Sequence, residues 1–153
     1  MKDTENIKHY NFLQGSIEWH NARKGILTAS QLNTLLTPAK LKIATGEKVK
    51  SLVYEVAAQR VNDFVEDTFC GYQMERGHIE EEVARGVYND NYDKTTTCGF
   101  ITNDSFGFKL GYSPDDLVGD DGLIEIKSRI QKFQIQTIVS CEVPAEYMLQ
   151  CQS

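Results

Sequence analysis

Three charged residues near the middle of the chain have the types and spacing of a metal-dependent hydrolytic site. Asp115 precedes a turn rich in glycine and aspartate, and Glu125 and Lys127 follow that turn with one residue between them. Side chains alternate between the two faces of a strand, so Glu125 and Lys127 share a face if 123–128 is a strand. If that strand forms a hairpin with the preceding segment, Asp115 lies beside Glu125. Two crowded carboxylates repel each other, and we therefore expect a divalent cation between them.

The chemistry that these residues favour is the cleavage of a phosphodiester. This reaction needs a nucleophilic water and positive charge beside the transition state, and Mg²⁺ held by a few carboxylates supplies both. We expect Asp115 and Glu125 to be metal ligands, together with the backbone carbonyl of Ile126. Lys127 would orient or deprotonate the attacking water. Acids and lysines are also common at strand ends, so the pattern leaves open a solvated surface without catalysis.

Other familiar sites do not fit. A calcium loop starting at Asp115 or Asp116 would lack the glycine at its sixth position and the glutamate at its twelfth. The four cysteines form no CxxC pair and the three histidines are scattered, which argues against zinc and favours buried, reduced thiols. The motifs of a Walker loop, a dinucleotide-binding fold and a nucleophile elbow are all absent from the sequence.

Helices and strands that would position the acids can be predicted from the apolar pattern. We expect helices at 16–25, 28–36, 48–66, 75–88, 132–140 and 145–153, and strands at 98–103, 106–112 and 123–128. The result is an α/β domain with a central mixed sheet. The last helix has no C-cap within the chain, so we expect a single domain over 1–153 that continues further in the natural protein.

The helix predicted at 75–88 raises a question about which acid faces inward. Its apolar face is formed by Ile79, Val83 and Val87, with Ala84 and Tyr88 beside them. At about 100° per residue, Glu80 falls within that face and Glu81 at its edge. Periodicity therefore favours Glu80 as the inward acid, although a helix edge can also face a site.

In the hairpin turn, we expect Asp116, Asp120 and Asp121 to be solvent-exposed turn residues.

A second group of residues, near the N-terminus, fits phosphate. Thr28 and Ser30 lie at the start of the helix predicted at 28–36, and Arg23 lies at the end of the preceding helix. Helix N-termini expose free N–H groups and attract anions. We expect a phosphate pocket here. The simpler alternative is that the hydroxyls only cap the helix and that Arg23 is a surface residue.

The charge distribution agrees with both sites. The net charge is −6, yet residues 1–60 carry nine basic and five acidic residues, whereas 61–126 carry four basic and fifteen acidic ones. A metal site next to an anion-binding surface would explain this division, as would simple solvation.

No stretch is apolar enough to span a bilayer, and the polar N-terminus lacks the core of a signal peptide. We therefore expect a cytoplasmic protein, in the host cytoplasm if a phage encodes it.

Four sequence blocks resemble one family of nucleases. Ser113-Pro114-Asp115, followed by Glu125-Ile126-Lys127, is similar to the core motif of the PD-(D/E)xK nuclease superfamily. Within it, the chain resembles the lambda exonuclease and YqaJ-type viral recombinase family. The remaining blocks occur in the family's order, and they are Trp19-His20 with Arg23, Gly25 and Thr28-Ala29-Ser30; Gly77 with Glu81 and Ala84-Arg85; and Tyr147-Met148 with Gln150 and Gln152.

The resemblance implies a PD-(D/E)xK core, with a central mixed sheet flanked by helices, and a specific activity. Members of this family are divalent-metal exonucleases that degrade the 5′ strand of linear duplex DNA. They leave 3′ overhangs for a single-strand annealing protein in phage recombination. The implied cofactor is Mg²⁺, with Mn²⁺ as a substitute and two ions in the site. A ring-shaped trimer is the implied assembly, and no membrane partner is implied.

The resemblance also assigns roles to single residues. Asp115 and Glu125 would bind metal and Lys127 would activate the water. Glu81 would act near the second ion, and Gln150 would support the attacking water. Arg23 and Ser30, with the Thr28 hydroxyl beside them, would hold the 5′ phosphate. Two alternatives stay open on the same core, namely a structure-specific endonuclease and a non-catalytic module that binds DNA or protein. A plain acidic domain without a site is the third.

Overall fold

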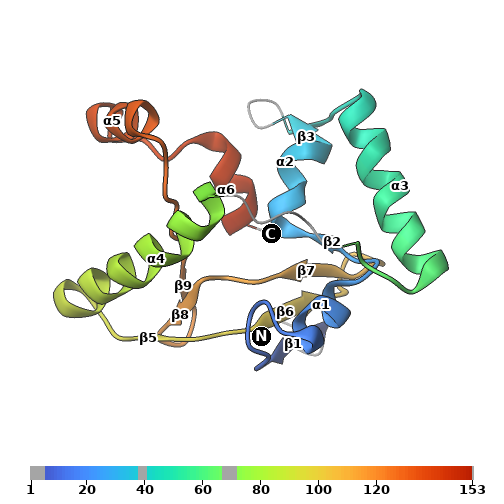
Figure 1. Ribbon diagram of the computed structural model, residues 1–153, viewed down its shortest axis with the longest axis horizontal. Helices are drawn as coiled ribbons and strands as arrows, with labels where there is room; N and C mark the ends of the chain where they lie inside the picture. The colour runs from blue at the N-terminus through green and yellow to red at the C-terminus, as the bar shows by residue number, and fades with distance from the viewer. Residues whose placement is uncertain (1–5, 38–40, 67–71, 153) are drawn as a thin grey trace. The chain divides into compact units, whose positions relative to one another are not determined.

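Residues 6–37, 41–66 and 72–152 are described by the computed structural model of this protein (Figure 1). The chain divides into two units. The first comprises Met1–Glu66, Gly99–Ser113 and Val143–Ser153, and the second comprises Asp67–Cys98 and Pro114–Glu142. None of the described helices is long and apolar enough to cross a membrane.

A four-stranded mixed sheet forms the base of the first unit, in the order β1-β6-β7-β2 (Figure 1). β1 (Ile7–Tyr10), β6 (Phe100–Asn103) and β7 (Leu110–Tyr112) pair antiparallel, whereas β2 (Leu27–Thr28) runs parallel to β7. The strand expected at 106–112 is shorter than predicted, because Phe106 and Phe108 are exposed and contact each other with tilted rings instead of entering the sheet.

Phe100 and Gly111 form the centre of this sheet. Phe100 is completely buried, and a Cβ atom added at Gly111 would collide with its ring. The aromatic ring thus occupies the space that a side chain on β7 would otherwise take. Close packing of this kind leaves no room for an extra methyl group.

Helical segments among the described residues complete the first unit. They are α1 (Ile17–Arg23), η2 (Ala29–Gln31), α2 (Leu32–Leu35), α3 (Glu47–Asn62) and α6 (Ala145–Cys151). Ser16 caps α1 as expected, since its Oγ accepts a hydrogen bond from the Trp19 N–H at 3.2 Å. The helix predicted at 28–36 is instead the end of β2, a 3₁₀ turn and one turn of α-helix, and β3 (Leu36–Thr37) then pairs with β4 (Lys42–Ile43). α6 packs against η2 and α2.

The second unit contains the acidic hairpin. β5 (Thr95–Thr96), β8 (Asp116–Val118) and β9 (Gly122–Ile124) form a three-stranded antiparallel sheet, so the hairpin belongs to this sheet and not to the mixed one. Gly119, at φ +58°, forms part of the tight turn between β8 and β9, a conformation that glycine adopts without a steric penalty. α4 (Tyr72–Asn91) and α5 (Gln131–Ser140) are the helices of this unit.

The apolar face predicted for α4 is not buried. Ile79, Val83 and Val87 are 63%, 65% and 56% exposed, so the prediction that they form the core is wrong. The partly buried side of α4 instead carries Glu81 and Arg85. Periodicity identifies an apolar stripe on a helix but not the surface that the helix packs against. Here the charged side of α4 makes the contact, because Arg85 binds Asp116. α3 shows the same limit, because Leu52 is buried while Val53 and Val61 are exposed.

The cysteines agree only partly with the expected buried thiols. No disulfide joins the cysteines in the described residues, and Cys98 is buried. Cys141 is exposed, so the prediction is wrong for this residue. Cys70 lies outside the described residues.

Candidate active site

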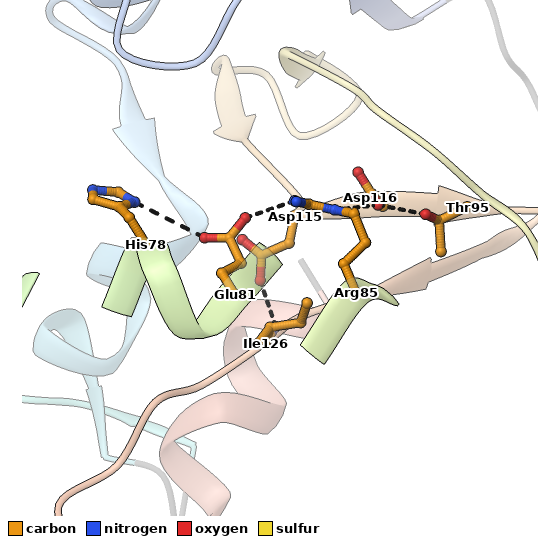
Figure 2. A network of polar contacts seen from close by, with 7 residues as sticks. All are labelled: His78, Glu81, Arg85, Thr95, Asp115, Asp116 and Ile126. Atoms are coloured by element: carbon orange, nitrogen blue, oxygen red, sulfur yellow. Dashed lines mark hydrogen bonds and ion pairs between the residues drawn. The ribbon is translucent and has the colours of Figure 1, made fainter. Parts of the chain in front are cut away.

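The β8–β9 hairpin brings Asp115 and Glu125 together. Asp116 is the register partner of Ile124 across the hairpin, so Asp115 and Glu125 are the next residues out from this pair. The backbone N–H of Ile126 donates a hydrogen bond to Asp115 Oδ2 (Figure 2). A hairpin that brings Asp115 beside Glu125 is therefore present, but its strands differ from the predicted ones: Asp116–Val118 pairs with β9 in place of the strand predicted at 106–112, and β9 ends at Ile124, so Glu125 follows it.

Glu125 and Lys127 share one face, as their spacing predicts. Lys127 Nζ donates a hydrogen bond to Glu125 Oε1. The Glu125 side chain is only 6% exposed, whereas one third of the Lys127 side chain reaches solvent. The ammonium group therefore lies at the rim of the site and the carboxylate lies inside it.

Glu81 is the helix acid that belongs to this group. Its Oε1 accepts a hydrogen bond of 2.7 Å from Arg85 Nη2, and its Oε2 lies 4.0 Å from His78 Nδ1 (Figure 2). The Glu81 side chain is 25% exposed. The Glu80 side chain is 52% exposed and accepts a hydrogen bond from Ser128. The periodicity argument for Glu80 is therefore wrong, and the motif spacing that favours Glu81 gives the inward acid.

The electrostatics of Asp115 show that three carboxylates influence one another. Burial raises the pKa of Asp115 to about 6, the Ile126 N–H opposes that rise, and the negative charges of Glu125 and Glu81 add to it. Lys127 offsets only part of this repulsion. A cation placed among these oxygens would favour the ionised carboxylates over the protonated ones.

These residues fit Mg²⁺ better than a metal that needs a complete protein cage. Among the described residues, no three His, Cys, Asp or Glu side chains are already arranged around one ion position. Mg²⁺ binds through one or two carboxylates and takes its other ligands from water and substrate phosphates. Asp115 and Glu125, with the Ile126 carbonyl expected beside them, provide such a partial set.

Asp116 is the residue that sequence reasoning missed. It is completely buried, and its Oδ2 accepts hydrogen bonds of 2.6 Å from both Arg85 Nε and Thr95 Oγ1 (Figure 2). The prediction that it is an exposed turn residue is wrong, whereas Asp120 and Asp121 are exposed as expected. The signal was the alternation of a strand, because an acid next to Asp115 must point to the opposite face.

Arg85 connects Asp116 to Glu81 through its forked guanidinium. Burial alone would lower the pKa of Arg85, but hydrogen bonds and charge attraction, first from Asp116 and then from Glu81, raise it. A planar guanidinium can hold two acceptors at fixed angles, which a lysine cannot do.

The first unit contains a pocket where phosphate binding is expected. It has a volume of about 120 Å³ and is lined by polar and aromatic side chains together with one small residue, namely Gln14, Trp19, Arg23, Thr28, Ala29, Ser30, Tyr112, Ser113 and Gln150. The predicted phosphate-binding residues Arg23, Thr28 and Ser30 are therefore neighbours. The structure adds Gln150 to them, and the role expected for Gln150 beside the attacking water stays a prediction.

Arg23 is held in this pocket by neutral partners. Its guanidinium carbon lies 4.0 Å from the centre of the Trp19 ring, and its Nη1 donates to Ser113 Oγ at 3.0 Å. Trp19 Nε1 reaches the same hydroxyl at 2.9 Å. Burial lowers the pKa of Arg23. A desolvated cation among neutral groups is well suited to bind an anion, so the alternative of a simple surface arginine does not fit.

The two hydroxyls of the pocket are also held in place. Thr28 Oγ1 and Ser30 Oγ are 3.3 Å apart, and Gln31 Oε1 accepts a hydrogen bond of 3.0 Å from the Thr28 N–H. Thr28 is buried. The hydroxyls thus form a pair at the start of η2, which is the local turn that the sequence presents as a helix start.

Comparison with known families identifies the family of this domain. Residues 18–153 match the YqaJ-like viral recombinase domain. The chain belongs to this family. The predicted family is therefore confirmed, and the match covers the expected site residues from Arg23 to Gln150. No curated protein sequence matches the chain significantly.

Solved structures confirm the PD-(D/E)xK fold of this YqaJ-like domain. The crystal structure of LHK-Exo in complex with dAMP has a TM-score of 0.77 and 31% identity, covering 90% of this chain and 66% of that one. The structure of the alkaline exonuclease LHK-Exo from Laribacter hongkongensis has a TM-score of 0.73 and 29% identity, covering 88% of this chain and 64% of that one. The YqaJ-like domain described here thus spans slightly less than two thirds of that exonuclease.

Proposed function

We propose that this YqaJ-like domain belongs to a cytoplasmic, Mg²⁺-dependent deoxyribonuclease that degrades the 5′ strand of linear duplex DNA. The observation that carries the proposal is the group formed by Asp115, Glu125, Glu81 and Lys127, in which three carboxylates act on one another beside one ammonium. Membership of the family and similarity to a protein described as an alkaline exonuclease support it.

Asp115 and Glu125 would hold Mg²⁺, together with the carbonyl of Ile126. Such an ion neutralises charge on the reacting phosphate and stabilises the leaving oxygen, and Mn²⁺ can replace it. Lys127 Nζ, which lies at the rim of the site, would orient the attacking water through a hydrogen bond. Glu81 would bind near a second ion, and Gln150 would support the water. The P–O3′ bond breaks as the water oxygen bonds to phosphorus.

Arg23, Ser30 and Thr28 would hold the terminal 5′ phosphate of the DNA. A phosphate offers several acceptor oxygens to a guanidinium and two hydroxyls at once. This contact would make DNA ends the preferred substrate, which favours an exonuclease over a structure-specific endonuclease. The 3′ overhangs would pass to a single-strand annealing protein, and by family resemblance the enzyme would act as a ring-shaped trimer.

The test compares three substrates with the full-length protein and Mg²⁺. We expect fast degradation of 5′-phosphorylated linear duplex, slower degradation of the 5′-hydroxyl duplex, and none of covalently closed circular DNA. Cutting of the closed circle would favour the endonuclease, and DNA binding without metal-dependent cleavage of any substrate would favour the non-catalytic module.

A lysine variant tests the mechanism. Lys127→Ala should reduce cleavage by about 10²–10⁴-fold, which is the usual contribution of a positioned acid or base. Metal-free DNA binding should stay near normal. Lys94→Ala is the matched control, because Lys94 is an exposed lysine of the same unit that binds the Asn89 carbonyl. Cleavage at the wild-type rate by Lys127→Ala would contradict the mechanism.

A further inference from the structure

Arg85 lies between a buried acid and the helix acid of the proposed site. Its Nε donates to Asp116 Oδ2 at 2.6 Å, and its Nη2 donates to Glu81 Oε1 at 2.7 Å (Figure 2). The Asp116 side chain is 1% exposed. Thr95 Oγ1, on β5, donates to the same Asp116 oxygen at 2.6 Å. The chain of contacts therefore runs from the sheet, through one guanidinium, to Glu81 on α4.

This arrangement fixes the direction of the Glu81 carboxylate. Asp116 is held by its strand and by Thr95, so the plane of the Arg85 guanidinium has little freedom. Because Nε and Nη2 lie in that plane, the position of Asp116 determines where Arg85 can hold Glu81 Oε1. The other oxygen of Glu81 stays directed away from Arg85, with His78 as the next side chain at 4.0 Å (Figure 2).

Two observations argue that the contact does more than attach the helix. Within the described part of the chain, the buried Oδ1 of Asp116 has no hydrogen-bond partner, although buried polar atoms are normally paired. In addition, α4 presents charged residues to the sheet while Ile79 and Val83 stay exposed. An apolar contact would attach the helix without burying a carboxylate.

We propose that Asp116 and Arg85 are positioning residues that hold Glu81 in the orientation needed for metal-dependent cleavage. This inference rests on the proposed function. Neither residue touches the substrate in this scheme, and both act through Glu81. Groups that orient the residues around a metal typically change activity or metal affinity by about 10–100-fold when they are replaced.

The experiment is a double-mutant cycle between Arg85→Lys and Glu81→Gln in the full-length protein. Arg85→Lys keeps the positive charge but loses the fork, so we expect kcat to fall by about 10–100-fold with little change in KM for DNA. In the Glu81→Gln background, the same replacement should change kcat by less than about twofold, because the residue through which it acts is gone. Equal losses in both backgrounds would overturn the proposal.

A matched control and a milder variant make the result specific. Arg76→Lys changes the other arginine of α4 that pairs with a glutamate four residues away, since Arg76 contacts Glu80 and Ser128. It should leave kcat near the wild-type value. Thr95→Val removes only the hydroxyl that holds Asp116, and it should lower kcat less than Arg85→Lys, again only when Glu81 is present. An equal loss in Arg76→Lys would overturn the proposal, and so would a Thr95→Val effect that persists in the Glu81→Gln background.

A binding measurement separates this inference from the proposed function. Mn²⁺ alone should raise the melting temperature of wild type and Arg76→Lys, and the rise should be smaller in Arg85→Lys and in Glu81→Gln. If wild type binds Mn²⁺ in this pattern but cuts no DNA, the proposed function fails, while the role of Arg85 in positioning Glu81 beside the ion stands. If wild type cuts DNA and Glu81→Gln cuts equally fast, the positioning role fails alone.

Discussion

The two units of this YqaJ-like domain contain opposite kinds of uncompensated charge. In the second unit, burial and then the negative charges of Glu125 and Glu81 raise the pKa of Asp115, and Lys127 offsets only part of this rise. In the first unit, Arg23 is desolvated between a tryptophan ring and a serine hydroxyl. The difference indicates two ligands of opposite sign, a cation for the acids and an anion for the arginine. A phosphodiester hydrolase that recognises a terminal phosphate requires both.

The largest expected effect concerns the acids. Asp115→Asn removes a metal ligand together with a repelled charge, so cleavage should fall below detection. The metal-free melting temperature should be unchanged or higher, since an ionised carboxylate with a raised pKa is destabilising above about pH 6. At an ion concentration of about 100 times Kd, binding stabilises wild type by about 2.7 kcal/mol. Calorimetry of Asp115→Asn with and without Mn²⁺ should show that the ion no longer stabilises the protein.

Asp120→Asn is the control for Asp115→Asn. Asp120 is an exposed acid of the β8–β9 turn, and its replacement removes one negative charge without touching the proposed ligands. It should keep the Mn²⁺-linked rise in melting temperature. If both variants keep that rise, the acids of the hairpin do not bind the ion.

A smaller effect is expected in the pocket. Arg23→Lys keeps the charge but loses the fork and its stacking on Trp19. Hydrogen bonds to charged groups contribute about 1.5–3 kcal/mol, which corresponds to a factor of about 10–100 in rate. The preference for 5′-phosphorylated over 5′-hydroxyl duplex, measured as a ratio of kcat/KM, should fall by that factor. Mn²⁺-linked stabilisation should not change.

Lys24→Ala is the neighbouring control for the pocket. Lys24 forms an ion pair with Asp63 at 2.6 Å and does not line the pocket. It should keep the preference for a 5′ phosphate. A loss of preference in both variants would mean that general positive charge, and not the pocket, attracts the DNA end.

The smallest effect concerns the helix that carries Arg23. Ser16→Ala removes the hydroxyl that accepts the Trp19 N–H. Loss of an N-cap typically reduces the free energy of unfolding by about 1 kcal/mol. Denaturant titration should show that decrease, with a modest loss of phosphate preference and unchanged Mn²⁺ binding. An effect on Mn²⁺ binding would contradict the separation of the two sites.

Much of the site was predictable because it depends on local rules. Asp115, Glu125 and Lys127 lie together once a hairpin forms, because the first two continue the register of β8 and β9 and Lys127 follows just beyond β9. The cap at Ser16 and the hydroxyls at Thr28 and Ser30 likewise follow from short-range hydrogen bonding. The motif block with Glu81 selected the inward acid where periodicity did not.

The rest depends on contacts between distant elements. Asp116 looks like a turn residue because Asp-rich loops are usually exposed, and its burial requires Arg85, thirty-one residues earlier in the chain. The prediction of which side of α4 is buried was wrong for a related reason. An apolar stripe favours burial only where an apolar surface faces it, and the described surface near α4 is charged.

The contact between Phe100 and Gly111 has a consequence for how this sequence can vary. Since the ring fills the space above the glycine, a larger residue at 111 is compatible only with a smaller one at 100. The two positions should therefore covary among relatives of this domain. Either change made alone would overpack or hollow the sheet from which Ser113 emerges to hold Arg23.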